Sequence, residues 1–136
     1  MPRSRAAAAH PSALPAPDRS PRHWAEAVVR RHLKRLGWTC LDAAAVVPGG
    51  ELDLVMRVGD TIVVVEVRQR ASTRYGAPAE TLRRGKRQRL RRSARLWARR
   101  HAQRFGLPDP PRMRIDAVLV TGGRSAHRID HLEDVA

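Results

Sequence analysis

The chain has 136 residues, of which 27 are Lys or Arg and only 13 are Asp or Glu, so its net charge is +14. This length holds one domain with a real core, and the charge predicts a polyanionic partner such as nucleic acid. With one cysteine, Cys40, the chain cannot form an internal disulfide, and no set of Cys and His residues has the spacing of a zinc site. No apolar run reaches the ~18 residues that a membrane span needs. We therefore expect a cytoplasmic protein without a membrane partner.

Residues 1–21 are rich in Pro, Ala, Ser and Arg, and Asp18 is their one acidic residue. The segment lacks the apolar centre of a secretory signal and shows no sustained period. We interpret it as a disordered basic tail, with an organellar transit peptide as the alternative. The folded domain is expected over residues 22–136.

From Pro21 the pattern becomes regular, and it predicts a single α/β domain with the order α-β-β-β-α-β-β. The first helix begins at Pro21 and stops at Gly37. Its apolar stripe is predicted to comprise Trp24, Ala27, Val28, His32 and Leu36. The other expected elements are strands at 38–47, 50–56 and 62–68, a loop at 69–78, a helix at 81–104, and strands at 113–121 and 127–132.

The second and third strands predict a hairpin around the turn residues Gly59-Asp60, because glycine accepts the positive φ of such turns. Paired residues then have numbers that sum to 119. Asp53 lies opposite Glu66, and Glu51 lies opposite Arg68. Since side chains alternate along a strand, these four charged groups share one face.

Two carboxylates opposed at roughly 4.5–5.5 Å repel each other unless a cation or a proton lies between them. Mg²⁺ or Mn²⁺ would relieve the repulsion, because hard cations take oxygen ligands. The alternative is a solvated face on which Arg68 pairs with Glu51. Val55 and Val64 on the same face indicate partial burial and favour the metal site. The opposite face reads as core, with Leu52, Leu54, Met56, Val63, Val65 and Val67.

The second helix carries most of the positive charge. No acidic residue occurs between Glu80 and Asp109, whereas eleven basic residues do. They are Arg83, Arg84, Lys86, Arg87, Arg89, Arg91, Arg92, Arg95, Arg99, Arg100 and Arg104. Neighbours of like sign repel at i,i+4, and a phosphate backbone along the helix would relieve that repulsion. An anionic membrane surface is the alternative, but the apolar stripe (Leu90, Ala94, Trp97, His101, Phe105) is needed for the core.

Several further motifs are found at residues 50–55 (GELDLV), 64–70 (VVEVRQR), 74–76 (RYG), Ala79-Glu80, Lys86, 114–118 (RIDAV) and His131. Together they resemble the YraN family of small bacterial proteins. The fold of that family is similar to the restriction-endonuclease-like, PD-(D/E)XK nuclease superfamily, which implies a mixed central sheet flanked by helices. The resemblance covers residues 21–136.

The resemblance implies specific roles. Asp53 and Glu66 would be the two acidic metal ligands, and Arg68 stands where the superfamily motif usually has lysine. Glu26 on the first helix would complete the metal shell, unless it is a surface glutamate beside Arg30. The candidate metal ligands are thus Asp53, Glu66, Glu26 and Glu51, the candidate catalytic residues Asp53, Glu66 and Arg68, and the candidate nucleic-acid contacts Lys86, Arg84, Arg87, Arg91, Arg95 and Arg70.

The implied reaction is Mg²⁺- or Mn²⁺-dependent hydrolysis of a phosphodiester. We expect DNA as the substrate more than RNA, and our hypothesis is branched or single-stranded DNA in repair or recombination. Arg68 stays protonated and is a poor general base, so a non-catalytic nucleic-acid-binding module is the alternative. Tyr75 is the one aromatic side chain placed in a loop where it could stack on a base.

Overall fold

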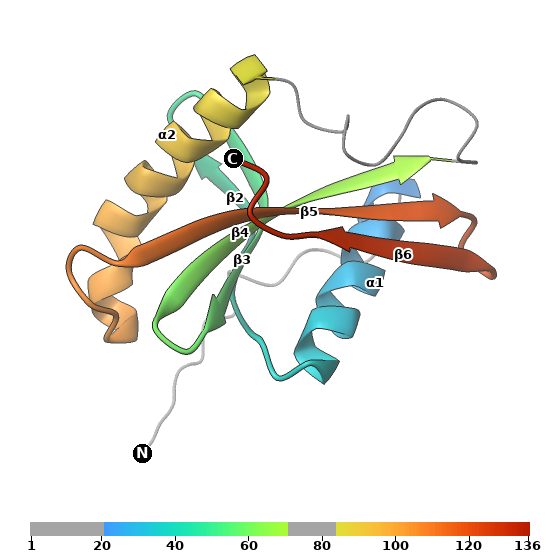
Figure 1. Ribbon diagram of the computed structural model, residues 1–136, viewed down its shortest axis with the longest axis horizontal. Coiled ribbons are helices and arrows are strands. Elements are labelled where there is room, and N and C mark those ends of the chain that lie inside the picture. Colours follow the sequence, from blue (N-terminus) through green and yellow to red (C-terminus); the bar gives the residue numbers. More distant parts are fainter. Residues whose placement is uncertain (1–20, 71–83) are drawn as a thin grey trace.

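The computed structural model describes residues 21–70 and 84–136, which form two helices, a five-stranded sheet and a short 3-10 helix (Figure 1). The elements are α1 (Pro21–Arg35), β2 (Thr39–Val47), β3 (Gly50–Val58), β4 (Thr61–Arg70), α2 (Arg84–His101), η4 (Ala102–Phe105), β5 (Arg112–Gly122) and β6 (His127–Leu132). The predicted α/β class and the mixed sheet flanked by helices are confirmed. The predicted order omitted η4, because the sequence pattern merged this turn with the end of α2.

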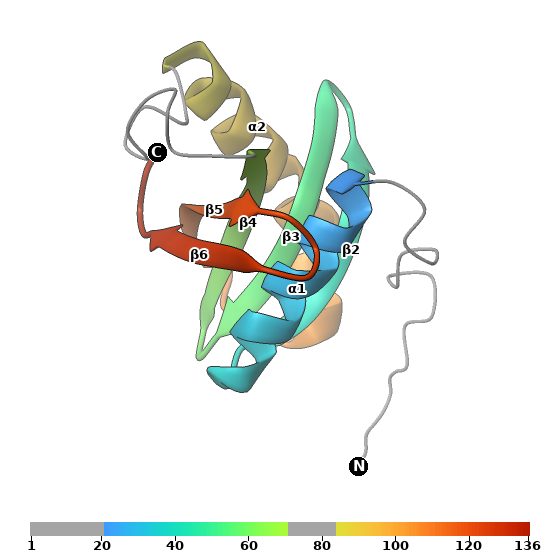
Figure 2. The same ribbon diagram turned by 90° about the vertical axis from the view of Figure 1, so that its right-hand side faces the viewer.

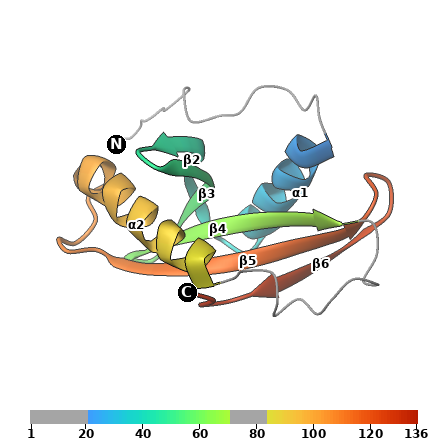
Figure 3. The ribbon, with the colours of Figure 1, turned by 90° about the horizontal axis from the view of Figure 1, so that it is seen from above.

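The sheet has the order β2-β3-β4-β5-β6. Only β4 and β5 are parallel, and the other neighbours are antiparallel. A parallel pair needs a long crossover connection, and α2 lies within the one that joins these two strands. The sheet twists strongly, so that β5 and β6 run in a different direction from β2 (Figure 3).

The hairpin register agrees with the prediction. Val58 pairs with Thr61 and the ladder runs to Leu54 opposite Val65, so paired numbers sum to 119. Gly59 in the turn has a φ of +58°. The predicted stop of α1 is confirmed as well, since Gly37 has a φ of +93° and follows the last helical turn.

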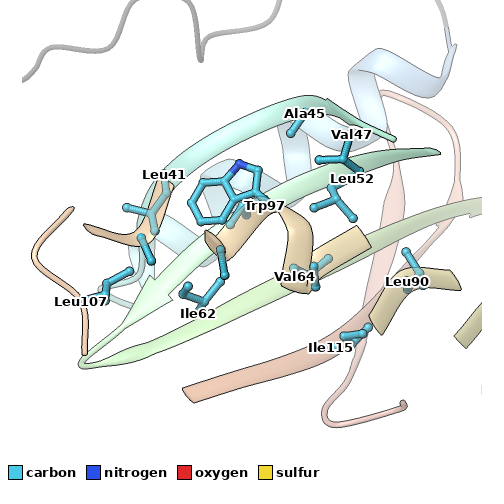
Figure 4. Close-up of a cluster of buried hydrophobic side chains, with 14 of the residues drawn as sticks. Leu41, Ala45, Val47, Leu52, Ile62, Val64, Leu90, Trp97, Leu107 and Ile115 are labelled. Carbon is cyan, nitrogen blue, oxygen red and sulfur yellow. The ribbon is translucent and has the colours of Figure 1, made fainter. Parts of the chain in front are cut away.

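Both faces of the sheet are buried, because α1 covers one and α2 covers the other (Figures 1 and 2). Val64 and Val55 pack in the cluster beneath α2, which agrees with the prediction that their face of the hairpin is covered. Leu54 packs in the cluster beneath α1. The prediction that Leu52 shares the face of Leu54 is wrong: Leu52 packs in the α2 cluster around Trp97 (Figure 4).

The buried stripe of α1 also differs from the prediction. Its buried members are Trp24, Ala25, Val29 and Leu33. Leu36 lies past the end of the helix and is 57% exposed. Residues 25, 29 and 33 are spaced by four, and so are residues 24, 28, 32 and 36. Spacing alone could not choose between these two adjacent rows, and packing on the sheet selected the row of 25, 29 and 33.

Helix α2 buries the predicted residues Leu90, Ala94 and Trp97, and the predicted His101 and Phe105 are half-buried. The Trp97 indole Nε1–H donates a hydrogen bond of 2.9 Å to Asp42 Oδ2 on β2. Trp97 therefore fixes α2 on the sheet through packing and through a polar contact.

Some predictions concern residues outside the described ranges. They are the tail up to residue 20, the loop residues from 71 onward including Tyr75, and the start of the second helix at 81–83. The predicted loop start at Gln69 is wrong, because β4 continues in parallel register with β5 to Arg70. No helix in residues 21–70 or 84–136 is long and apolar enough to cross a membrane.

Candidate carboxylate site beneath the basic helix

Asp53 and Glu66 lie where the β3–β4 ladder ends. The last paired residues are Leu54 and Val65, one step before the two acidic residues. Beyond that step the Asp53 side chain bridges the strands: its Oδ2 accepts a hydrogen bond of 2.9 Å from the Val67 amide. The two acidic side chains are only 3% and 4% exposed, so the solvated-face alternative does not describe them.

The backbone is irregular at the same place. Ala44 on β2 has a φ of +51°, a left-handed conformation that is uncommon for a residue with a Cβ atom. It lies between the pairs Ala43–Leu54 and Ala45–Leu52, and hence opposite Asp53. Ala43 and Leu54 pack in the cluster beneath α1, whereas Ala45 and Leu52 pack in the cluster beneath α2. Both strands therefore change the face that they bury at this point. This change of face is the point at which strict alternation misplaced Leu52.

The two carboxyl groups interact directly. Burial raises the pKa of Glu66 to about 7, and a hydrogen bond with Asp53 and the charge of Asp53 add to the increase. The positive charges of Lys86 and Arg68 act in the opposite direction. Near neutral pH Glu66 is therefore only partly ionised in the free protein, as expected of one member of a buried carboxyl pair.

Two basic side chains approach the pair. Lys86, in the first turn of α2, places its Nζ 3.4 Å from Glu66 Oε2. Arg68 follows Glu66 by two positions on β4, so both side chains are on the face beneath α2. The Arg68 Nε is buried and has no hydrogen-bond partner among the described residues. A buried donor of this kind is expected to meet a ligand or water.

Two of the four predicted metal ligands are brought together, namely Asp53 and Glu66. Glu26 is half-buried on α1, and Glu51 is exposed on β3, where it pairs with Val46 of β2. Among residues 21–70 and 84–136, no three His, Cys, Asp or Glu side chains are grouped so that they could hold a metal ion. The structure thus groups the pair without the two further glutamates.

Most of the exposed residues of α2 are arginines. Arg91, Arg95 and Arg99 recur at spacings of four along one exposed stripe, so they lie in a row along the helix. The predicted contacts Arg87 and Arg70 are half-buried, and the side chain of Arg84 is outside the described part of the structure.

A second polar cluster was not recognised from the sequence as a unit. Asp116 on β5 is fully buried and accepts hydrogen bonds from Arg114 Nε and Nη2 at 2.8 Å and from the Asp134 amide at 2.9 Å. The His131 Nε2 lies 2.7 Å from its Oδ2. These contacts hold the pKa of Asp116 below its ordinary value despite burial. They tie the C-terminal segment to the sheet and leave Asp116 satisfied, which is a structural role.

Several known bacterial proteins are similar to this chain in sequence. The model of the uncharacterised protein family UPF0102 matches residues 25–120. A UPF0102 protein of Thermus thermophilus is 42% identical over 109 residues, which are 80% of this chain and 90% of the relative. The UPF0102 protein YraN of Escherichia coli strain SMS-3-5 is 43% identical over 97 residues, covering 71% of this chain and 72% of the relative. YraN of Shigella sonnei matches to the same extent.

Proposed function

The chain belongs to the uncharacterised protein family UPF0102, the family of the YraN proteins, and from its buried carboxyl pair we propose that it binds nucleic acid and hydrolyses phosphodiester bonds with a divalent metal ion. Asp53 and Glu66 carry the proposal. Two interacting carboxyls at 3% and 4% exposure cost free energy in a chain that offers many surface positions for charge. We further propose that the fold is restriction-endonuclease-like.

The donor set fits Mg²⁺ or Mn²⁺. Burial and the neighbouring Asp53 raise the pKa of Glu66 to about 7, and a divalent ion bound through oxygen ligands would favour the ionised form of both carboxyls. Asp53 and Glu66 are the residues that would hold the ion. When bound, such an ion activates water and stabilises negative charge on phosphate.

The chain's own groups would bind and orient the substrate. Arg68 has a buried Nε without a partner among the described residues, and its permanent charge suits a phosphate oxygen. The exposed arginines of α2 would bind the flanking phosphates and displace counterions, which makes affinity depend steeply on salt. The substrate class is nucleic acid, with DNA expected over RNA.

The test is cleavage by purified protein, with Mg²⁺ or Mn²⁺, of single-stranded, duplex and branched DNA and of RNA. Asp53→Ala and Glu66→Ala should each abolish cleavage and leave affinity within about threefold of the wild type. Asp60→Asn is a matched control, because Asp60 is an exposed carboxylate in the turn of the same hairpin. If the wild type cuts none of these substrates, or if the two alanine variants still cut them, the enzymatic proposal is wrong.

Arg68 favours a second candidate, a non-catalytic nucleic-acid-binding module. A residue that stays protonated cannot accept a proton from water, and loss of one catalytic group can remove turnover while binding persists. In this case Asp53→Ala and Glu66→Ala should bind nucleic acid as tightly as the wild type or more tightly, because each removes negative charge. Tight, salt-dependent binding without cleavage in the same substrate panel would support this candidate.

A further inference from the structure

The ion pair between Lys86 and Glu66 stands out in a chain whose cations are nearly all arginine. The sequence contains two lysines, Lys34 and Lys86, among 27 Lys and Arg residues, which leaves 25 arginines. One of these two lysines is 3.4 Å from a carboxylate oxygen of the buried pair. Lysine is a compact charge on a flexible four-carbon stem, whereas arginine is a rigid planar group. The residue in this position can therefore change partners by rotating its stem.

We propose that Lys86 is a positioning residue that holds Glu66 in the free protein and transfers its ammonium group to a substrate phosphate when nucleic acid binds. Nucleic acid and the divalent ion then bind cooperatively. This inference rests on the proposed function, because it concerns the same carboxyl pair. It adds that the free protein binds metal weakly and that substrate strengthens the metal site.

The reason is competition between charges. An ammonium group at Glu66 occupies one of the two carboxyls that a metal ion would use, and it repels a doubly charged ion beside it. At a few ångströms and partial burial, a unit charge changes an affinity by about an order of magnitude. The Glu66 side chain is 4% exposed and the Lys86 side chain 35% exposed, so solvent screens this repulsion in part.

The position of Lys86 allows the exchange. Its side chain is 35% exposed, and Glu66 is its one ion-pair partner within residues 21–70 and 84–136. It lies in the first turn of α2, where the exposed Arg89 is its neighbour at i+3. A phosphate bound by Arg89 would bring negative charge close to Nζ. Binding reciprocity then requires that metal strengthen nucleic-acid binding by the same factor.

The experiment measures Mn²⁺ affinity of the full chain by titration calorimetry, alone and with a saturating phosphorothioate DNA strand that resists cleavage. We expect the wild type to bind Mn²⁺ about tenfold tighter with DNA than without it, within the usual range for coupled sites. Lys86→Gln should bind Mn²⁺ alone about tenfold tighter than the wild type and lose most of the enhancement by DNA. Lys34→Gln, which removes the only other lysine of the sequence, an exposed residue of α1, should behave like the wild type.

A second variant, Lys86→Arg, keeps the positive charge and should keep the weak Mn²⁺ binding of the free protein, so the inference is tested even if Lys86→Gln does not fold. Unchanged Mn²⁺ affinity in Lys86→Gln, or full enhancement by DNA in that variant, would overturn it. Absence of Mn²⁺ binding in all variants would overturn both the inference and the metal site. Cooperative binding without cleavage of ordinary DNA would refute the enzymatic activity and leave the inference standing.

Discussion

Replacement of Glu66 by glutamine should make the free protein more stable above pH 7. The wild type must ionise a carboxyl that is 4% exposed and lies against Asp53, and this raises the pKa of Glu66 from 4.5 to about 7. Glutamine has nearly the same shape and can accept or donate the hydrogen bond to Asp53, but it carries no charge to desolvate. A residue central to the proposed site thus costs stability in the absence of metal.

The magnitude follows from the two pKa values. The difference between 4.5 and about 7, at 1.36 kcal/mol per pKa unit, amounts to about 3 kcal/mol. The pKa of Glu66 is higher in the folded state than in the unfolded state. The free-energy cost of ionising Glu66 is therefore absent below pH 4.5, grows between pH 4.5 and 7, and is complete above pH 7. Asp116 does not interfere: its pKa is lowered, so the stability it contributes is lost only as the pH falls below about 4.

The measurement is urea unfolding of the wild type and Glu66→Gln at pH 5 and pH 8 with divalent ions chelated. The gain in free energy of unfolding from Glu66→Gln should be about 2–3 kcal/mol larger at pH 8 than at pH 5. The comparison cancels the titration of groups that do not interact with Glu66. Asp60→Asn, which changes an exposed carboxyl, should give the same difference at both pH values. A Glu66→Gln variant that is no more stable than the wild type at pH 8 would refute the reasoning.

Three further outcomes are expected. Replacing Arg91, Arg95 and Arg99 together by glutamine should lower the slope of log affinity for duplex DNA against log salt by about 2–3, and an unchanged slope in a fluorescence titration would remove this row from the interface. Asp116→Ala should lower the free energy of unfolding in urea by about 3 kcal/mol, because its arginine and histidine partners lose a buried acceptor; a loss below 1 kcal/mol would contradict the assigned structural role. Trp97→Phe should cost about 1–3 kcal/mol, since it leaves the Asp42 carboxylate without the indole donor, and thermal unfolding checks this value.

Local patterns determined the elements of this protein well. Gly59-Asp60 specified both the turn and the register of the β3–β4 hairpin, because a two-residue loop leaves one way to pair the strands. The same register predicted that Asp53 and Glu66 face each other, and the structure brings them together. The β6 strand lies at the predicted residues 127–132. These features depend on neighbours in the sequence, which is why the sequence predicts them.

Features that depend on two distant segments were not predictable in this way. The choice between two adjacent stripes on α1 is made by packing on the sheet, and the change of face at Leu52 lies beside the irregular backbone at Ala44 on another strand. The four contacts of Asp116 come from three separate positions of the chain.

The sequence by itself determined the order of most elements, the hairpin register, the uniform positive charge of α2 and the identity of the two carboxyls. The tertiary structure decided that those carboxyls are buried, that Lys86 from α2 contacts Glu66, and that Glu26 and Glu51 are not grouped with them in the described part of the chain. The division has a physical reason. Backbone periodicity and turn chemistry act over a few residues, whereas burial and electrostatic pairing depend on how helices cross the sheet.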